Sequence, residues 1–176
     1  MSDIIIGKNT QTNTDYVITL PTVAIITGKK MAGKTFLMRQ IIERKTDGRI
    51  ILITNKPDSY RGLKEEIIKI TKEHPDFEID GHLTIADCSD VYDDDPDHVI
   101  DDAIRKFHKK IIKDDLIILD EAYPFFDDPD SKKELYDAIE ESWREGSSFI
   151  IMTNRTNLIL DEVPELMNLC TYAICM

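Results

Sequence analysis

The eight residues 28–35, GKKMAGKT, restrict the fold of this chain more than any other stretch of its sequence. They match the pattern G-x-x-x-x-G-K-[ST]. They follow the apolar, β-branched run TVAIITG (22–28) and lead into an apolar-rich segment from Lys34 to about Lys45. Runs of this kind are typical of a buried strand and a helix. The expected unit is a strand, a tight glycine loop and a helix, which is a building block of α/β proteins.

A glycine loop between a strand and a helix can bind phosphate groups. Its glycines let backbone N–H groups approach an anion, and the N-terminus of the helix adds positive charge. We expect the ammonium group of Lys34 to reach the β- and γ-phosphates of a nucleotide, and the hydroxyl of Thr35 to bind Mg²⁺. The predicted nucleotide-binding residues are Gly28, Lys29, Lys30, Met31, Ala32, Gly33, Lys34, Thr35 and Phe36.

The remaining apolar runs repeat the order of strand and then helix. Fully apolar strands that alternate with helices are typical of a parallel sheet covered on both faces. The sequence therefore predicts a three-layer, doubly wound, mainly parallel α/β fold in a single domain, residues 1–176, with residues 1–21 as a two-stranded lead-in to a core of residues 22–176. The further predicted strands are RIILITN (49–55), HLTIADC (82–88), LIILDE (116–121), FIIMTNR (149–155) and TYAIC (171–175).

Capping signals and apolar spacing predict the helices. Asp95 and Pro96 suit the N-cap and the first position of a helix. Ser131 and Glu134 have the spacing of a capping box at the start of a helix. Apart from the helix that follows the glycine loop, the predicted helices cover residues 63–74, 95–112, 131–146 and 163–169.

The strand LIILDE ends in two adjacent carboxylates, Asp120 and Glu121. A carboxylate at the end of an apolar strand suits the Mg²⁺ that accompanies a bound nucleotide, so we expect Asp120 to share this metal with Thr35. A second carboxylate suits a general base that activates water. A phosphotransferase, in contrast, must keep water away from the γ-phosphate. Glu121 therefore favours hydrolysis of ATP over transfer of its phosphate. The ordinary alternative is that Glu121 only caps the next segment.

Polar residues near the strand FIIMTNR are further candidates. Asn154 lies at its carboxyl end, where open α/β sheets bind ligands, and its amide could orient the attacking water or contact the γ-phosphate. The ordinary alternative for Asn154 is a loop residue without a role in the site. Arg144 and Arg155 are candidates for an arginine finger that reaches the nucleotide of a neighbouring subunit. The ordinary alternative for Arg144 is a favourable interaction with the C-terminal end of its helix.

The charge of the chain is unevenly distributed. The net charge is −12, but residues 1–70 hold 12 Lys and Arg against 7 Asp and Glu, whereas residues 71–176 hold 10 against 27. Nonspecific nucleic-acid binding depends on Lys and Arg neutralising phosphates, so any DNA contact is expected to be local and in the basic part. Lys29 and Lys30 are either solvated loop charges or contacts to DNA or a neighbouring subunit.

The sequence carries neither a secretion signal nor a membrane-spanning run. The N-terminus lacks a signal peptide, and no apolar run approaches the roughly 18 residues of a membrane helix. The three cysteines, Cys88, Cys170 and Cys175, are odd in number and widely spaced, which fits a reducing compartment. We therefore expect a cytoplasmic protein without a membrane span.

With these motifs, the chain resembles the FtsK/HerA branch of the additional-strand P-loop ATPases. It looks most like the small genome-packaging ATPases of viruses with an internal membrane and double jelly-roll capsids. The matching stretches are ITGKKMAGKTFL, LIILDEAYPFF and WREGSSFIIMTNRTNLILDEVPELMNLCTYAI, and the resemblance covers residues 22–175. Asn154 stands where the family usually has glutamine, and Arg144 matches the family arginine to within one position.

This resemblance implies a RecA-like strand order of 5-1-4-3-2, with ATP and Mg²⁺ as ligands and double-stranded DNA as a partner. It also implies a ring of identical subunits, which forms either alone or on binding nucleotide or DNA. For a viral protein it further implies a capsid partner and a location in the host cytoplasm or the virion.

Three other functions stay open at the level of sequence. Filamentous-phage assembly ATPases are close relatives of the packaging group. GKKMAGKT and DEAYPFF are also similar to type II thymidine kinases, although those enzymes hold zinc with a cysteine set that this chain lacks. A nucleotide-gated binding protein with negligible turnover has the same motifs.

Overall fold

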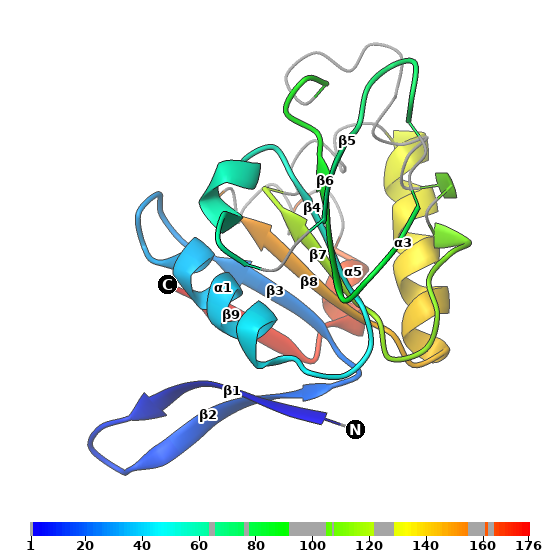
Figure 1. The fold of residues 1–176 in the computed structure, drawn as a ribbon. Helices are drawn as coiled ribbons and strands as arrows, with labels where there is room; N and C mark the ends of the chain where they lie inside the picture. The colour runs from blue at the N-terminus through cyan, green and yellow to red at the C-terminus, as the bar shows by residue number, and fades with distance from the viewer. Residues whose placement is uncertain are drawn as a thin grey trace.

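The computed structural model describes residues 2–63, 66–75, 78–91, 105–106, 108–121, 129–154, 161 and 164–176. The chain begins with an antiparallel hairpin of β1 (Ser2–Asn9) and β2 (Thr14–Leu20), within the residues predicted as a two-stranded lead-in. The hairpin projects from the lower end of the molecule in Figure 1. Arg44 of the following helix donates a hydrogen bond to the carbonyl of Ile5, and the hairpin side chains Ile4, Ile18 and Leu20 are buried.

A seven-stranded sheet forms the centre of the molecule, and every pairing within it is parallel. The order of its strands is β5-β6-β4-β7-β8-β3-β9. When β9, β3, β8, β7 and β4 alone are numbered along the chain, they lie in the order 5-1-4-3-2, and β6 and β5 extend the sheet beyond β4. The strands are β3 (Val23–Thr27), β4 (Ile50–Thr54), β5 (Glu66–Lys69), β6 (Leu83–Asp87), β7 (Leu116–Asp120), β8 (Ser148–Thr153) and β9 (Tyr172–Cys175).

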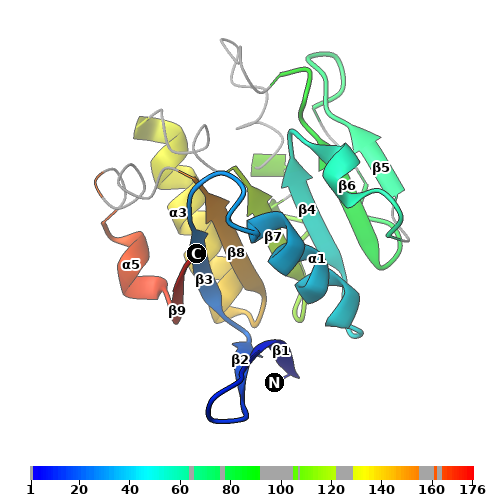
Figure 2. The same cartoon turned by 90° about the vertical axis from the view of Figure 1, so that its left-hand side faces the viewer.

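Helices cover both faces of this sheet, as Figures 1 and 2 show. The helix α1 (Lys34–Arg44) packs on one face together with the hairpin. The helices α3 (Pro129–Arg144) and α5 (Leu166–Leu169) pack on the other. Because side chains alternate along a strand, β3 sends Ile25 toward α3 and Ile26 toward α1. The predicted three-layer α/β fold is confirmed. No helix among the described residues is long and apolar enough to cross a membrane.

The prediction of a helix over residues 63–74 is wrong. Residues 66–69 instead form β5, which pairs in parallel with β6 at the edge of the sheet. Ile67, Ile68, Ile70 and Thr71 are β-branched, and such residues favour a strand when a partner strand is available. The partner, β6, begins 14 residues after β5 ends, so the local apolar spacing does not reveal it.

The helix α3 differs from its prediction at the start and matches it at the end. It begins at Pro129, so Ser131 lies in its first turn and is not the N-cap. Proline suits that position because its missing N–H is not needed there. At the other end, Gly146 has a φ of +99°, and Ser147 donates its N–H to the carbonyl of Ser142 at 2.9 Å. This is a Schellman motif, which explains why the helix ends just before this glycine.

Two other predicted helices also differ from the structure or lie partly outside the described residues. The helix predicted from Asp95 to residue 112 falls mostly outside the described residues, and the described part is helical at residues 105, 106 and 108. The segment predicted over residues 163–169 forms α5, which begins later, at Leu166. Between β4 and β5 the chain also forms a 3₁₀ helix, η1 (Pro57–Tyr60), that was not predicted.

Candidate nucleotide-binding site

The glycine loop connects β3 to α1 at the carboxyl edge of the sheet, as predicted. Gly33 has a φ of +96°, and Met31 has a φ of +68°, so the loop needs left-handed backbone on both sides of Ala32. The first helical hydrogen bond runs from the N–H of Leu37 to the carbonyl of Gly33 at 2.9 Å. The N–H groups at the start of α1 therefore have no helical acceptor and can face an anion.

Lys34 folds back over this loop. Its Nζ donates to the carbonyl of Gly28 at 2.7 Å and to the carbonyl of Lys29 at 3.1 Å. The side chain is buried, with 7% of the residue exposed. The ammonium group thus lies at the centre of the loop that is predicted to hold the phosphates.

Gly28 is required by a close backbone approach. A Cβ atom at this position would lie 2.6 Å from the carbonyl oxygen of Met176, so no other residue fits without a shift of the backbone. The N–H of Met176 donates to the carbonyl of Thr27 at 2.9 Å and holds this contact in place. The segment after β9 therefore supports one side of the loop.

The other loop residues line the same site with different exposure. Lys29, Lys30 and Met31 are exposed, and Met31 is 97% exposed at the tip of the loop. In the first turn of α1, Thr35 is partly buried and Phe36 is 69% exposed. An apolar side chain this exposed beside a candidate ligand site is available for contact with a bound group.

Asp120 lies at the end of β7, and two donors fix its carboxylate. The hydroxyl of Thr54 donates to Oδ2 of Asp120 at 3.0 Å, and the hydroxyl of Tyr60 donates to the same oxygen at 2.9 Å. Asp120 is 3% exposed, and this burial raises the pKa of its carboxyl group. Burial also raises the pKa of Tyr60, so its phenol remains a neutral donor. Both donors orient the carboxylate from one side.

The strand registers place Asp120 level with the end of β3. Met152 of β8 is paired with Ile26 on one side and with Asp120 on the other. Two strand spacings amount to about 10 Å. The glycine loop and the acidic pair therefore lie along the same edge of the sheet with one strand between them.

Glu121 follows Asp120 with a left-handed backbone, at a φ of +57°. Its Oε1 lies 3.3 Å from Nζ of Lys56, which follows β4. The Glu121 side chain is 17% exposed, whereas that of Lys56 is 53% exposed. The structure thus gives the predicted general base a basic partner that the sequence did not indicate.

The three candidates near β8 fall in different places. Asn154 follows the end of β8, the strand between β3 and β7, and it is exposed at the same edge of the sheet. Arg144 ends α3 at the opposite edge, where its Nη2 lies 2.7 Å from Oε1 of Glu140. Arg155 lies outside the described residues. The structure therefore places Asn154 at the same edge as the loop and the acidic pair. It places Arg144 far from the candidate site of its own chain.

Sequence reasoning missed Thr54, Lys56 and Tyr60. Their contacts with Asp120 and Glu121 join positions at least 60 residues apart in the chain. One signal was available for Thr54, because the polar residue that ends an apolar parallel strand lies at the ligand edge of the sheet. The sequence around Lys56 and Tyr60 carries no comparable signal.

The donors at this edge fit Mg²⁺. The hydroxyl of Thr35 and the carboxylate of Asp120 are both oxygen ligands, which this hard ion prefers. The donors of Thr54 and Tyr60 converge on Oδ2 of Asp120, so the carboxylate is held in one orientation by its surroundings. Asp120 and Thr35 are the residues that would hold the ion.

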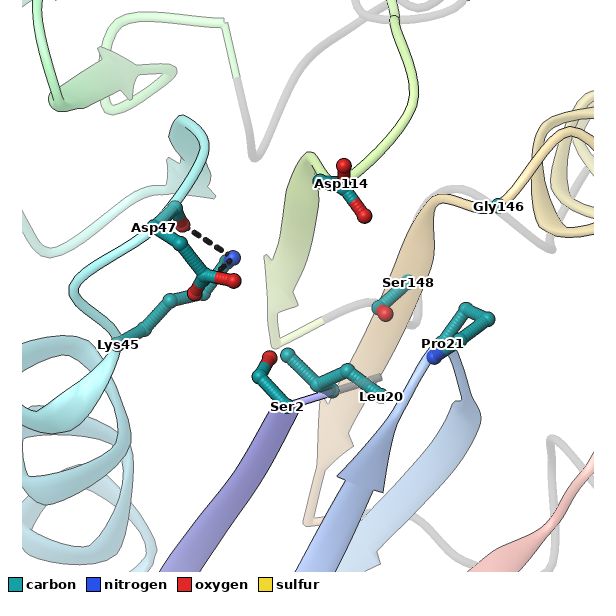
Figure 3. A pocket seen from close by; sticks show the side chains of 8 residues that line it. All are labelled: Ser2, Leu20, Pro21, Lys45, Asp47, Asp114, Gly146 and Ser148. Atoms are coloured by element: carbon teal, nitrogen blue, oxygen red, sulfur yellow. Dashed lines mark hydrogen bonds and ion pairs between the residues drawn. The ribbon is translucent and has the colours of Figure 1, made fainter.

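A small pocket lies at the opposite edge of the sheet, where β3, β7 and β8 begin (Figure 3). Its volume is about 20 Å³, which is room for one water molecule and far too small for a nucleotide. The close-up shows Lys45 bonded to Asp47 on one side of the pocket. Its lining residues are Ser2, Leu20, Pro21, Lys45, Asp47, Asp114, Gly146 and Ser148.

No protein-family model matches the sequence, and no curated protein matches it either. Several solved structures, in contrast, are similar to this chain. The genome packaging NTPase B204 of Sulfolobus turreted icosahedral virus 2, in complex with ATP-gammaS, is 17% identical with a TM-score of 0.54, over 90% of this chain and 75% of that one.

Two bacterial proteins are similar as well. VirB4 of Thermoanaerobacter pseudethanolicus is 12% identical with a TM-score of 0.72, over 98% of this chain and 83% of that one. ATPases 2 and 3 of Thermomonospora curvata EccC are 14% identical with a TM-score of 0.58, over 94% of this chain and 32% of that one. At such low identity these likenesses concern the fold, and the chain has an α/β P-loop NTPase fold.

Proposed function

We propose that this chain hydrolyses ATP with Mg²⁺ and couples hydrolysis to the movement of double-stranded DNA, as in a genome-packaging motor. The observation that carries the proposal is the placement of the Lys34 loop and the Asp120–Glu121 pair at one edge of the sheet, separated by a single strand. A phosphate-binding loop and a buried carboxylate at this spacing suit the two ends of a nucleotide–metal complex.

The chain's own residues divide the chemistry between them. The loop N–H groups and Lys34 bind the β- and γ-phosphates and offset their negative charge. Asn154 orients a water molecule, and Glu121 takes its proton as the water oxygen bonds to the γ-phosphorus. The bond from the γ-phosphorus to the bridging oxygen breaks, which releases ADP and phosphate. Mg²⁺, when held by Thr35 and Asp120, neutralises charge on the phosphates.

The proposed coupling to DNA has two supports. The structure is similar to a protein whose name states that it packages genomes, B204. The exposed Lys29 and Lys30 lie beside the candidate site and belong to the net-basic part of an acidic chain. We further propose that subunits assemble into a ring, in which an arginine of one subunit, Arg144 or Arg155, reaches the nucleotide of the next.

The test is ATP hydrolysis by the wild type and by Lys34→Ala, with and without double-stranded DNA. We expect hydrolysis that requires Lys34 and rises with DNA. Lys8→Ala is the matched control, since Lys8 is exposed on the distant hairpin strand β1. Absence of Lys34-dependent hydrolysis under both conditions contradicts the proposal. Transfer of phosphate from ATP to thymidine in the same assay favours a nucleoside kinase instead.

A further inference from the structure

Lys56 and Glu121 form an ion pair between two neighbouring strand ends. Lys56 follows the last residue of β4 by two positions, and Glu121 directly follows β7. The Nζ of Lys56 lies 3.3 Å from Oε1 of Glu121. β4 and β8 flank β7 on opposite sides, and the glycine loop lies beyond β8, after β3. The ion pair therefore draws the Glu121 carboxylate toward the side of β7 that faces away from the loop.

This direction matters for a general base. A base must reach the water that attacks the γ-phosphate, and that phosphate is expected over the loop and Lys34. We propose that Lys56 is a positioning residue that holds Glu121 away from the attacking water until the pair separates. This inference rests on the proposed ATP hydrolysis.

The segment that carries Lys56 is anchored on both sides. The N–H of Lys56 donates to Oγ1 of Thr54 at 3.0 Å. Four residues later, Tyr60 is fully buried, and its hydroxyl bonds to Asp120. Arg39 of α1 donates to the carbonyl of Ser59 at 3.0 Å. The same segment thus contacts both carboxylates and the helix that starts at the loop, so the position of Lys56 is fixed relative to the site.

Two simpler roles for Lys56 make different predictions. If its ammonium binds the phosphates of ATP, its removal raises KM. If the ion pair only stabilises the fold, its removal lowers the Tm and leaves kcat unchanged. A residue that restrains the base changes kcat alone, and it acts only through Glu121.

The experiment compares steady-state ATP hydrolysis by the wild type, Lys56→Met, Lys56→Arg and Glu121→Gln, and by the Lys56→Met/Glu121→Gln double variant. We expect Lys56→Met to raise kcat about five-fold, since half-exposed ion pairs restrain weakly, with KM within two-fold of the wild type. Lys56→Arg should match the wild type, because it keeps the charge. The double variant should equal Glu121→Gln alone.

Lys69→Met is the matched control. Lys69 ends the edge strand β5, which β6 separates from β4, and it pairs with Asp90 at 2.7 Å. Its side chain is 55% exposed, close to the 53% of Lys56. Its kcat should stay at the wild-type value. An unchanged or lower kcat in Lys56→Met, or a KM raised more than two-fold, overturns the role of Lys56. If the wild type itself does not hydrolyse ATP, the proposed function fails instead.

Discussion

Glu121 has an unusual backbone for a residue with a large side chain. Its φ of +57° costs about 1 kcal/mol relative to a right-handed conformation, and such strain is common at functional sites. Side chains of β7 alternate between the two faces of the sheet, and Asp120 is on the face of α1. The turn at Glu121 removes this residue from that alternation. Two adjacent carboxylates can therefore serve one site, one as a metal ligand and one as a base.

We predict that Glu121→Gln retains ATP binding and lowers turnover by about 10² to 10⁴-fold, because the amide cannot accept the proton of water. Binding is measured by titration with a fluorescent ATP analogue, and turnover by phosphate release. Glu145→Gln is the control, since Glu145 is exposed at the opposite edge of the sheet. Unchanged turnover in Glu121→Gln removes this residue from the role of base.

The three cysteines should differ in reactivity. Burial raises the pKa of Cys170 to about 11, Cys88 is buried, and Cys175 is exposed. The thiolate is the reactive form of cysteine, and pH 8 lies far below the pKa of Cys170. The thiol of Cys170 therefore reacts slowly at this pH. Iodoacetamide at pH 8 should label Cys175 first, and the labelling of Cys170 should increase as pH rises toward about 11. Peptide mass spectrometry measures each site, and equal rates for Cys170 and Cys175 at pH 8 contradict this order.

An ion pair joins the beginnings of two central strands. The guanidinium of Arg49, just before β4, donates to Asp115, just before β7, at 3.0 Å and 2.7 Å. Asp115 also accepts the N–H of Ile112 at 2.8 Å and is 1% exposed. Asp115 in turn raises the pKa of the Arg49 guanidinium through their hydrogen bonds. This pair aligns the strands that carry Thr54 and Asp120 at their other ends.

We predict that Asp115→Ala lowers the free energy of unfolding by about 2–3 kcal/mol, somewhat less than for a fully buried pair, because Arg49 can recover some hydration. Urea denaturation measures the change. Asp137→Ala, which breaks an exposed pair with Lys133 on α3, should cost less than 1 kcal/mol. Equal losses in the two variants contradict the structural role of Asp115.

The elements show what a single sequence can and cannot reveal. The glycine loop, β7 and α1 were predicted correctly because their signals are local: a spaced motif, an apolar run and an apolar-rich segment directly after the loop. The strand β5 was mistaken for a helix because its pairing with β6 is not local. Tyr60 and Lys56 were missed for the same reason, since their positions depend on how η1 packs against β7.

Arg144 and Lys34 lie at opposite edges of the sheet. Arg144 therefore cannot complete the site of its own chain, and any role as an arginine finger requires a neighbour. We predict that Arg144→Ala lowers ATP hydrolysis by about 10³-fold, the lower end of the range for arginine fingers. Light scattering with and without nucleotide measures whether the subunits assemble.

Mixing two inactive variants tests the same idea. Lys34→Ala keeps Arg144 and lacks a working loop, whereas Arg144→Ala keeps the loop. A mixed assembly should recover part of the activity, because some interfaces then combine an intact loop with an intact arginine. If Arg144→Ala has full activity, or if mixing recovers none, Arg144 is not the finger, and Arg155 becomes the residue to test.

The central sheet ends in a four-residue strand at each side, β5 and β9. A strand this short offers few free backbone groups to another chain, and β5 places charged residues, Glu66 and Lys69, on either side of its isoleucines. The edge strands of two subunits are therefore poorly suited to pair with each other through backbone hydrogen bonds. Copies of this protein that meet in an assembly should do so through side chains and loops, so that contacts can loosen and re-form during a cycle without unzipping a β-ladder.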